Sequence, residues 1–227
     1  MKTVELTLDE SKHYYTREAF NTLRTNILFS GKDVKTILIT SCFAHEGKST
    51  IAFEAARNLA EAGKKVLLID ADLRKSVYAS RYTNERGLSG LSEYLSGQID
   101  LDGVLCRTQI ENLNLIFSGP FPPNPTELIG SNSFRELLDS QRDQYDYILV
   151  DAPPLGMVID AAVLAAVCDG AILVINAGTV KFRVAQRVTE QLRKSGCRIL
   201  GAVLNQTRKK DKRGRYYGHY GEYYAEK

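Results

Sequence analysis

Four consecutive residues, Gly47-Lys48-Ser49-Thr50, form the end of a phosphate-binding loop of the G-x-x-x-x-G-K-[ST] type. In such a loop the glycine lets the backbone approach the phosphates, the lysine pairs with them, and the serine hydroxyl can bind Mg²⁺. The first glycine of the pattern is replaced by Cys42, and His45 stands where a small residue is usual. We expect the nucleotide to contact Cys42, Ala44, His45, Glu46, Gly47, Lys48, Ser49 and Thr50.

Two carboxylates, Asp70 and Asp72, lie two residues apart in the stretch LLIDADLRK. On an extended strand they point to the same side, and ligands of a parallel sheet bind beyond the carboxyl ends of its strands. Adjacent carboxylates at such an end repel each other unless a cation lies between them, and Mg²⁺ is the expected cation. The structural alternative is that Asp72 caps a turn while Asp70 pairs with Arg74.

A third carboxylate, Asp151, ends the apolar run in the stretch YILVDAPP. This is the Walker B form, in which the Asp holds Mg²⁺ directly or through water. The two prolines that follow stop the strand and stiffen its exit. Together the three motifs predict a site for ATP and Mg²⁺, with Ser49, Asp72 and Asp151 as metal ligands. The alternative is that G-K-S-T is a chance tetrapeptide.

Apolar runs that alternate with helical patterns must position these residues. The runs are almost continuously apolar, which is typical of strands covered on both faces, and the helical patterns end at glycines. This alternation predicts an α/β fold with a doubly wound, mostly parallel sheet of the P-loop NTPase type and helices on both faces. The expected strands are 36–41, 65–70, 113–117, 145–151, 170–175 and 199–205, and the expected helices 16–29, 48–62 and 181–195.

Length and composition fit one globular domain. The 227 residues include 44% hydrophobic and 25% charged residues, which is ordinary for a soluble protein. No apolar run approaches the roughly 18–20 residues that span a bilayer, and the first ten residues lack the apolar core of a signal peptide. The four cysteines show neither C-x-x-C nor zinc spacing, and we interpret them as reduced cytosolic thiols.

The C-terminal segment 207–227 differs in kind from residues 1–206. It holds seven Lys or Arg and three Asp or Glu, a balance of +4, so the rest of the chain has 23 minus 24, or −1. Because its largest aliphatic residue is an alanine, we predict a disordered tail after a single domain. Five of the twelve tyrosines lie in the last twelve residues: Tyr216, Tyr217, Tyr220, Tyr223 and Tyr224.

The charge of this tail leaves several interpretations open. Because basicity is confined to the tail, a general nucleic-acid interface on the fold is disfavoured. Aromatic and basic residues in the tail could instead stack on RNA. The basic run 208–215 could steer the tail to an acidic surface or to anionic lipid, or it is merely solvated.

In this order the motifs resemble one family, the bacterial tyrosine kinases of capsule and exopolysaccharide synthesis in their stand-alone cytoplasmic form. The resemblance covers nearly the whole chain. It runs through REAFNTLRTNIL (N-terminal helix), ITSCFAHEGKST (Walker A), LLIDADLRK (Walker A′), SGPFPPNPTELI (Pro-rich linker), YILVDAPP (Walker B) and the tyrosine-rich end. The A′ motif and the tail are the specific parts, since many ATPases share Walker A and Walker B.

The resemblance implies an autophosphorylating kinase that uses Mg-ATP. It would transfer the γ-phosphate to the five C-terminal tyrosines of neighbouring copies of itself. Lys48, Asp70 and Asp72 would be catalytic. Either Asp70 or Asp72 could accept the tyrosine proton, and we favour Asp72 on the metal and Asp70 as the base. Asn205 would lie near the adenine, although a turn residue at a strand end is an equally simple interpretation. The chain has neither H-R-D nor D-F-G, so kinase machinery of the eukaryotic type is absent.

The resemblance also implies partners. In the family an E-x-x-R-x-x-R motif on the N-terminal helix contacts the next subunit of a ring, and Glu18, Asn21 and Arg24 stand in register with it here. The alternative is an ordinary helix surface. A transmembrane adaptor of the polysaccharide co-polymerase type would recruit this cytoplasmic protein to the inner face of the plasma membrane, and a cognate tyrosine phosphatase would reverse its phosphorylation. No nucleic-acid partner is expected.

Two other functions remain open on the sequence. One is a deviant-Walker ATPase switch of the kind that positions septa or plasmids. Such proteins usually carry a second lysine near the start of the loop, and residues 41–46 contain none. The other is a binding protein that keeps the fold but has lost catalysis, as Cys42 and His45 would suggest. Against this, histidine tolerates left-handed backbone better than most non-glycine residues, so we expect the turn at His45 to be kept.

Overall fold

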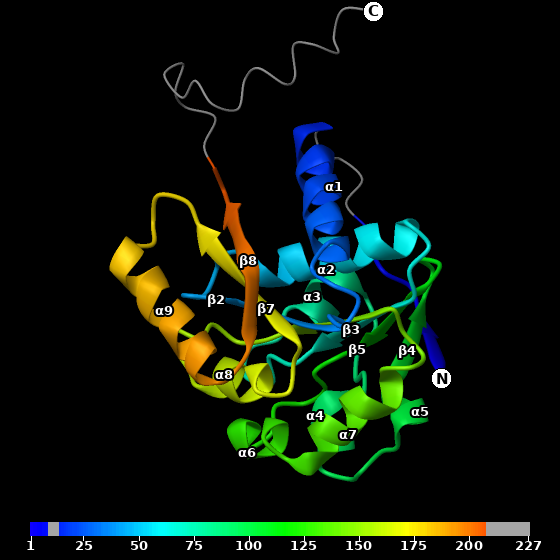
Figure 1. Ribbon diagram of the computed structural model, residues 1–227. Helices are drawn as coiled ribbons and strands as arrows, with labels where there is room; N and C mark the ends of the chain where they lie inside the picture. Colours follow the sequence, from blue (N-terminus) through cyan, green and yellow to red (C-terminus); the bar gives the residue numbers. More distant parts are fainter. Residues whose placement is uncertain (9–13, 208–227) are drawn as a thin grey trace, which may run out of the picture.

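The computed structural model describes residues 1–8 and 14–207, and an eight-stranded sheet runs through this part of the chain (Figure 1). The strand order is β1-β4-β5-β3-β6-β2-β7-β8. Every neighbouring pair is parallel except β4 and β5. The strands are β1 (Lys2–Val4), β2 (Thr36–Ser41), β3 (Val66–Asp70), β4 (Leu105–Thr108), β5 (Leu113–Ile116), β6 (Tyr147–Asp151), β7 (Gly170–Asn176) and β8 (Arg198–Asn205).

Helices cover both faces of this sheet, as the sequence predicts. Successive residues of β2 point to opposite faces, so Ile37 and Ile39 pack into one hydrophobic cluster and Leu38 into the other. Helices α1, α2 and α3 contribute to the first cluster, and α4, α7, α8 and α9 to the second. The helices are α1 (Tyr14–Leu28), α2 (Lys48–Glu61), α3 (Tyr78–Tyr82), α4 (Leu91–Leu95), α5 (Leu101–Val104), α6 (Pro125–Ile129), α7 (Asn132–Gln141), α8 (Asp160–Ala165) and α9 (Phe182–Lys194).

The six predicted strands and three predicted helices are all present, with ends that differ by two residues at most. Two strands, β1 and β4, are absent from the prediction. They are three and four residues long and lack a sustained apolar run. They pair with each other across about a hundred residues of chain, with Lys2 opposite Cys106. This long-range pairing is what makes β1 a strand, whereas β4 pairs in addition with β5, its antiparallel neighbour in the chain.

The expectation that every predicted strand is covered on both faces is wrong for β8. None of its residues is fully buried, and Leu204 is 62% exposed. The reason is its position, because β8 is the edge strand beside β7 and the helices cover an edge only in part. An apolar run therefore indicated the strand correctly but not its burial.

Some sequence-based expectations concern residues outside the described ranges. The predicted disordered tail lies almost wholly in residues 208–227, so the boundary at 206 stays a prediction. In the part of the chain that the structure describes, no helix has both the length and the apolar character needed to cross a membrane. The four cysteines are free thiols, and all except Cys168 are buried.

Gly90 joins the start of α4 to the backbone of the linker that follows β5. A Cβ at this position would lie 2.2 Å from the Phe117 carbonyl oxygen and 2.3 Å from the Gly119 nitrogen. We therefore expect Gly90→Ala to lower the free energy of unfolding by about 1–3 kcal/mol, as measured by urea denaturation. Gly201→Ala is the matched control, because a Cβ there meets nothing within 4 Å. Equal stability of the two variants would contradict this close packing.

Candidate active site

The site lies where three neighbouring strands end. In the sheet β6 lies between β2 and β3, and all three run in the same direction. The loop after β2 carries the phosphate-binding motif, β6 ends on Asp151, and β3 ends on Asp70. These two aspartates are direct register partners. The parallel sheet thus brings together three motifs that lie far apart in the sequence.

The phosphate-binding loop uses left-handed backbone at two positions. His45 has φ 65°, which confirms that histidine keeps the turn. Gly47 has φ 86° and precedes the first turn of α2. The left-handed backbone favours glycine here, and a Cβ at Gly47 would lie 2.2 Å from Nδ2 of Asn205 and displace that side chain. The backbone N–H groups at the start of α2 are available to an anion, as phosphate binding needs.

Glu46 closes this loop from within, a role that the sequence did not indicate. Its carboxylate accepts hydrogen bonds from the backbone N–H groups of Cys42, at 2.6 Å, and Phe43, at 2.8 Å. It also accepts one from the N–H of Asn176, at 3.1 Å, at the end of β7. The residue is only 3% exposed. The side chain of Glu46 therefore binds the protein itself, so only its backbone is left to contact a ligand.

Cys42 and Asn205 also support the loop from outside the cavity. The Cys42 side chain packs into the hydrophobic core, where burial, reinforced by the charge of Glu46, raises the pKa of its thiol to about 11. Asn205 donates from Nδ2 to the Glu46 carbonyl oxygen at 2.9 Å, and its Oδ1 accepts from the N–H of Gln206. Asn205 is thus both a strand-end turn residue and a brace for the loop.

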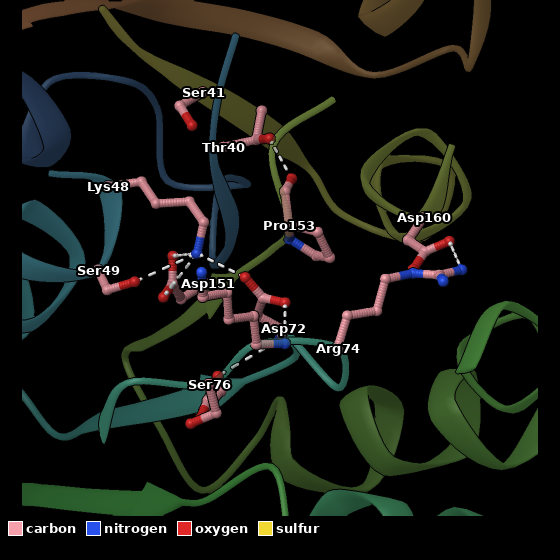
Figure 2. A network of polar contacts seen from close by, with 12 residues as sticks. Thr40, Ser41, Lys48, Ser49, Asp72, Arg74, Ser76, Asp151, Pro153 and Asp160 are labelled. Carbon is pink, nitrogen blue, oxygen red and sulfur yellow. Dashed lines mark hydrogen bonds and ion pairs between the residues drawn. The ribbon is translucent and has the colours of Figure 1, made fainter. Parts of the chain in front are cut away.

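The Lys48 ammonium lies at the centre of the site (Figure 2). Its Nζ is 3.1 Å from Oδ2 of Asp72 and 3.4 Å from each carboxylate oxygen of Asp151. It also donates to Oγ of Ser49 at 3.2 Å. Burial on its own lowers the pKa of Lys48, but the charges of Asp151 and Asp72 outweigh it and raise this pKa overall. The lysine is therefore held in its charged form.

Asp70 lies behind this cluster and has no exposed surface. Burial, followed by the charge of Asp151, raises its pKa to about 7. Burial likewise raises the pKa of Asp151. The Asp70 carboxylate accepts hydrogen bonds from the Ser76 hydroxyl and from the N–H of Asp72. If Asp70, Asp72, Asp151 and Lys48 are all ionised, two negative charges remain in excess, which favours a further cation at the site.

The alternative pairing of Asp70 with Arg74 is wrong, because Arg74 binds Asp160 instead, with 2.6 Å from Nε to Oδ2. The other half of that alternative is correct. Oδ1 of Asp72 accepts a hydrogen bond from the N–H of Lys75 at 3.0 Å. Asp72 therefore caps a turn and pairs with Lys48 at the same time.

A cavity of about 210 Å³ opens over these groups. Of the predicted site residues, Ala44, His45, Gly47, Lys48, Ser49, Thr50 and Asp72 line it. Three cations that the sequence did not single out as ligands line it too, namely Arg74, Lys75 and Arg81. The first two lie two and three residues after Asp72 in the A′ motif, whereas no local signal marks Arg81. The apolar side of the cavity is formed by Val77, Pro153, Pro154, Met157 and Val158.

The predicted metal ligands suit Mg²⁺ in their chemistry. Ser49, Asp72 and Asp151 supply only hard oxygen atoms, which Mg²⁺ prefers, and all three surround the Lys48 ammonium. Within the described residues, no group of three or more His, Cys, Asp or Glu side chains is placed to hold a metal ion by itself. A Mg²⁺ ion here would therefore need phosphate oxygens and water to complete its coordination.

The residues expected at a subunit contact share one face of α1. Nδ2 of Asn21 donates to Oε1 of Glu18 at 3.2 Å, and Nη1 of Arg24 lies 3.5 Å from the carbonyl oxygen of Asn58 in α2. Glu18 is exposed, whereas Asn21 and Arg24 are half-buried. The subunit contact itself stays a prediction.

The chain is similar to known proteins along most of its length. The AAA domain family model matches residues 34–195. The tyrosine-protein kinase CpsD of Streptococcus agalactiae is 43% identical over 208 residues, which cover 92% of this chain and 90% of that protein. The kinase domain of the Escherichia coli tyrosine kinase ETK has a TM-score of 0.82 at 28% identity, covering 96% of this chain and 94% of that one.

A weaker likeness joins the chain to an ATPase. The septum site-determining protein MinD of Pyrococcus horikoshii, solved in complex with Mg-ADP, has a TM-score of 0.64 at 26% identity and covers 75% of this chain and 70% of that one. The fold is therefore a nucleotide-binding one. The stronger likeness to kinases, in both coverage and TM-score, supports the kinase interpretation over the ATPase switch.

The raised pKa of Asp70 predicts a pH dependence of stability in the absence of nucleotide and metal. The folded-state pKa of about 7 exceeds the unfolded value of about 3.9, so the folded protein retains a proton that the unfolded chain releases. Folding therefore becomes less favourable as pH rises from about 4 to about 7. Between pH 5 and pH 8 the ionisation of Asp70 should lower the native protein's free energy of unfolding by on the order of 1–3 kcal/mol. Asp70→Asn has no carboxyl to ionise, so this part of the loss should be absent from it.

Urea denaturation at several pH values, with a chelator present, measures this effect. Gly201→Ala, which adds no ionisable group and whose Cβ meets nothing within 4 Å, serves as the control and should leave the slope of stability against pH unchanged. Parallel curves for Asp70→Asn and the native protein would mean that Asp70 is ionised throughout this range.

Proposed function

The chain belongs to the bacterial tyrosine-protein kinases, and from that membership we propose that it transfers the γ-phosphate of Mg-bound ATP to C-terminal tyrosines of neighbouring copies of itself. The observation that carries this proposal is the convergence of Lys48 with Asp72 and Asp151 beside a cavity lined by a phosphate-binding loop. Charge neutralisation and positioning dominate phosphoryl transfer, because its transition state is loose.

In this proposal Lys48 and the N–H groups at the start of α2 bind the phosphates. Ser49, Asp72 and Asp151 hold Mg²⁺, which when bound neutralises charge on the phosphate oxygens. Asp72 is suited to the metal because its carboxylate faces the cavity. The apolar side formed by Pro153 and its neighbours excludes water from the transfer.

Asp70 is the proposed acceptor of the tyrosine proton. Burial raises its pKa to about 7 in the absence of metal, which makes it a stronger base than an exposed carboxylate. A tyrosine hydroxyl has a pKa near 10 and needs such a base. The Asp70 carboxylate is fully buried, and the half-buried Ser76 donates its hydroxyl hydrogen to it.

The burial of the other tyrosines supports the tail as the phosphate acceptor. Five tyrosines have side chains that the structure describes, and all are buried or half-buried: Tyr78, Tyr82, Tyr94, Tyr145 and Tyr147. Tyr78 also donates its hydroxyl to the Ser49 carbonyl oxygen at 3.1 Å. Of the remaining seven, five are the proposed acceptors Tyr216, Tyr217, Tyr220, Tyr223 and Tyr224.

The proposal extends to partners on the strength of the family. Neighbouring copies form a homo-oligomer and meet through the α1 face that carries Glu18, Asn21 and Arg24. A ring is the form that the family suggests for this oligomer. A transmembrane adaptor of the polysaccharide co-polymerase type recruits the cytoplasmic kinase to the inner face of the plasma membrane. A tyrosine phosphatase reverses the reaction, and capsular or exopolysaccharide synthesis is the process regulated. The proposal includes no nucleic-acid partner, and it keeps Asn205 as a candidate neighbour of the adenine.

The central test is to incubate purified protein with Mg-ATP, with and without an adaptor peptide, and to map phosphotyrosine by mass spectrometry. We expect phosphate on the five tail tyrosines, and a loss of about 10²–10³-fold or more in Lys48→Met because the charge that neutralises the phosphates is removed. Lys32→Met, at an exposed lysine, is the matched control and should retain activity. ATP hydrolysis without phosphotyrosine would instead favour the ATPase switch, and neither activity would favour a binding protein.

A mixing experiment tests transfer between copies. Lys48→Met with an intact tail is combined with an active chain that ends at residue 207. Phosphate should appear on the tail of the inactive copy, because the only intact active site belongs to the other chain. An unphosphorylated tail in this mixture, alongside a phosphorylated tail in the intact protein, would show transfer within one chain.

A further inference from the structure

Asp160 is a buried carboxylate that the reaction proposed above does not use. It lies in the first turn of α8 and is 1% exposed. An ionised group at such a depth needs a charged or hydrogen-bonded partner, since burying it alone costs several kcal/mol. The partners it has lead directly to the active site.

Both oxygens of Asp160 are bound (Figure 2). Nε of Arg74 donates to Oδ2 at 2.6 Å, and Nη2 donates to Oδ1 at 3.2 Å. The Thr126 hydroxyl donates to Oδ1 at 2.7 Å and accepts from Nη2 of Arg74 at 2.8 Å. Three segments that are distant in the sequence therefore meet in one closed network: the A′ loop, helix α6 of the Pro-rich linker, and α8.

Arg74 connects this network to the reacting groups. It lines the same cavity as Lys48 and Asp72 and follows Asp72 by two residues. Between them Leu73 is buried in the core, and the N–H of Lys75 binds the carboxylate of Asp72. The short segment 72–75 is thus anchored at each residue, and Asp160 provides the anchor for Arg74.

We infer that Asp160 and Thr126 are positioning residues, which hold Arg74 and thereby fix the carboxylate of Asp72 in the orientation that binds the nucleotide-bound metal. This inference rests on the proposed function, because it assumes that Asp72 is a metal ligand. A bidentate arginine pair supplies direction as well as charge, which a lysine in its place cannot reproduce. Groups that orient a metal ligand from behind typically change metal affinity about 10–100-fold when they are altered.

The test measures ADP binding by calorimetry, once with Mg²⁺ and once with a chelator. In the native protein Mg²⁺ should strengthen ADP binding. The strengthening by Mg²⁺ is the ratio of the two affinities, and in Arg74→Lys this ratio should fall about 10–100-fold. Thr126→Val removes one hydroxyl and leaves the ion pair between Arg74 and Asp160. In this variant the strengthening of ADP binding by Mg²⁺ should fall about two- to tenfold. Should Arg74→Lys fail to fold, Thr126→Val carries the test.

Arg142→Lys is the matched control. Arg142 is as exposed as Arg74, at 36% against 37%, and pairs with Asp169 at 2.9 Å. That pair lies at the opposite end of β2, where Asp169 binds the N–H of Thr36. The substitution should lower thermal stability and leave the effect of Mg²⁺ on ADP binding at its native value.

Each outcome is decisive. A loss of the Mg²⁺ effect in Arg74→Lys but not in Arg142→Lys supports positioning by Asp160 and Thr126. An undiminished Mg²⁺ effect in both Arg74→Lys and Thr126→Val overturns it, and the network is then only structural. Native protein that fails to bind ADP at all would instead refute the nucleotide site, which separates failure of this inference from failure of the proposed function.

Discussion

The structure depends on one electrostatic arrangement, in which the Lys48 ammonium neutralises carboxylates that converge at the ends of β3 and β6. Asp70 and Asp151 are register partners in the sheet, so the backbone itself forces two buried acids together. Burial raises both pKa values, and repulsion by Asp151 adds to the effect for Asp70. Lys48 offsets part of this cost, and a divalent cation with a nucleotide would offset more. This excess of negative charge therefore favours the binding of a further cation at the site.

The loop that carries Lys48 shows how a phosphate-binding turn is kept without its first glycine. The carboxylate of Glu46 binds the two N–H groups at the start of the loop, and Asn205 binds the loop's carbonyl oxygen from the last strand. Internal hydrogen bonds thus supply the order that a tighter glycine turn would otherwise provide. The loop, β7 and β8 are consequently coupled, although β8 is itself an exposed edge strand.

On the other side of the site, the A′ loop is held by a separate network. Asp160 and Thr126 bind Arg74, while Ser76 binds Asp70. The two acids of the A′ motif therefore have different environments: Asp72 faces the cavity and pairs with Lys48, and Asp70 is enclosed behind it. The two acids therefore differ in their chemistry. Asp72 places a negative charge at the cavity, whereas Asp70 has a pKa of about 7.

The amino-acid sequence alone determined the fold class, the main strands and helices, and the order of the three motifs, because apolar periodicity and punctuating glycines are local signals. It also identified Lys48, Asp72 and Asp151 as neighbours, because parallel strands end at one edge of a sheet. Tertiary structure alone decided that Arg74 binds Asp160 and not Asp70, that Glu46 closes the loop, that β1 and β4 are strands, and that β8 is exposed. The pairing of Arg74 with Asp160, the bond from the Asn176 N–H to Glu46, and the pairing of β1 with β4 join residues far apart in the chain, which no local pattern encodes. The closure of the loop by Glu46 onto Cys42 and Phe43 is local, but no apolar periodicity marks it.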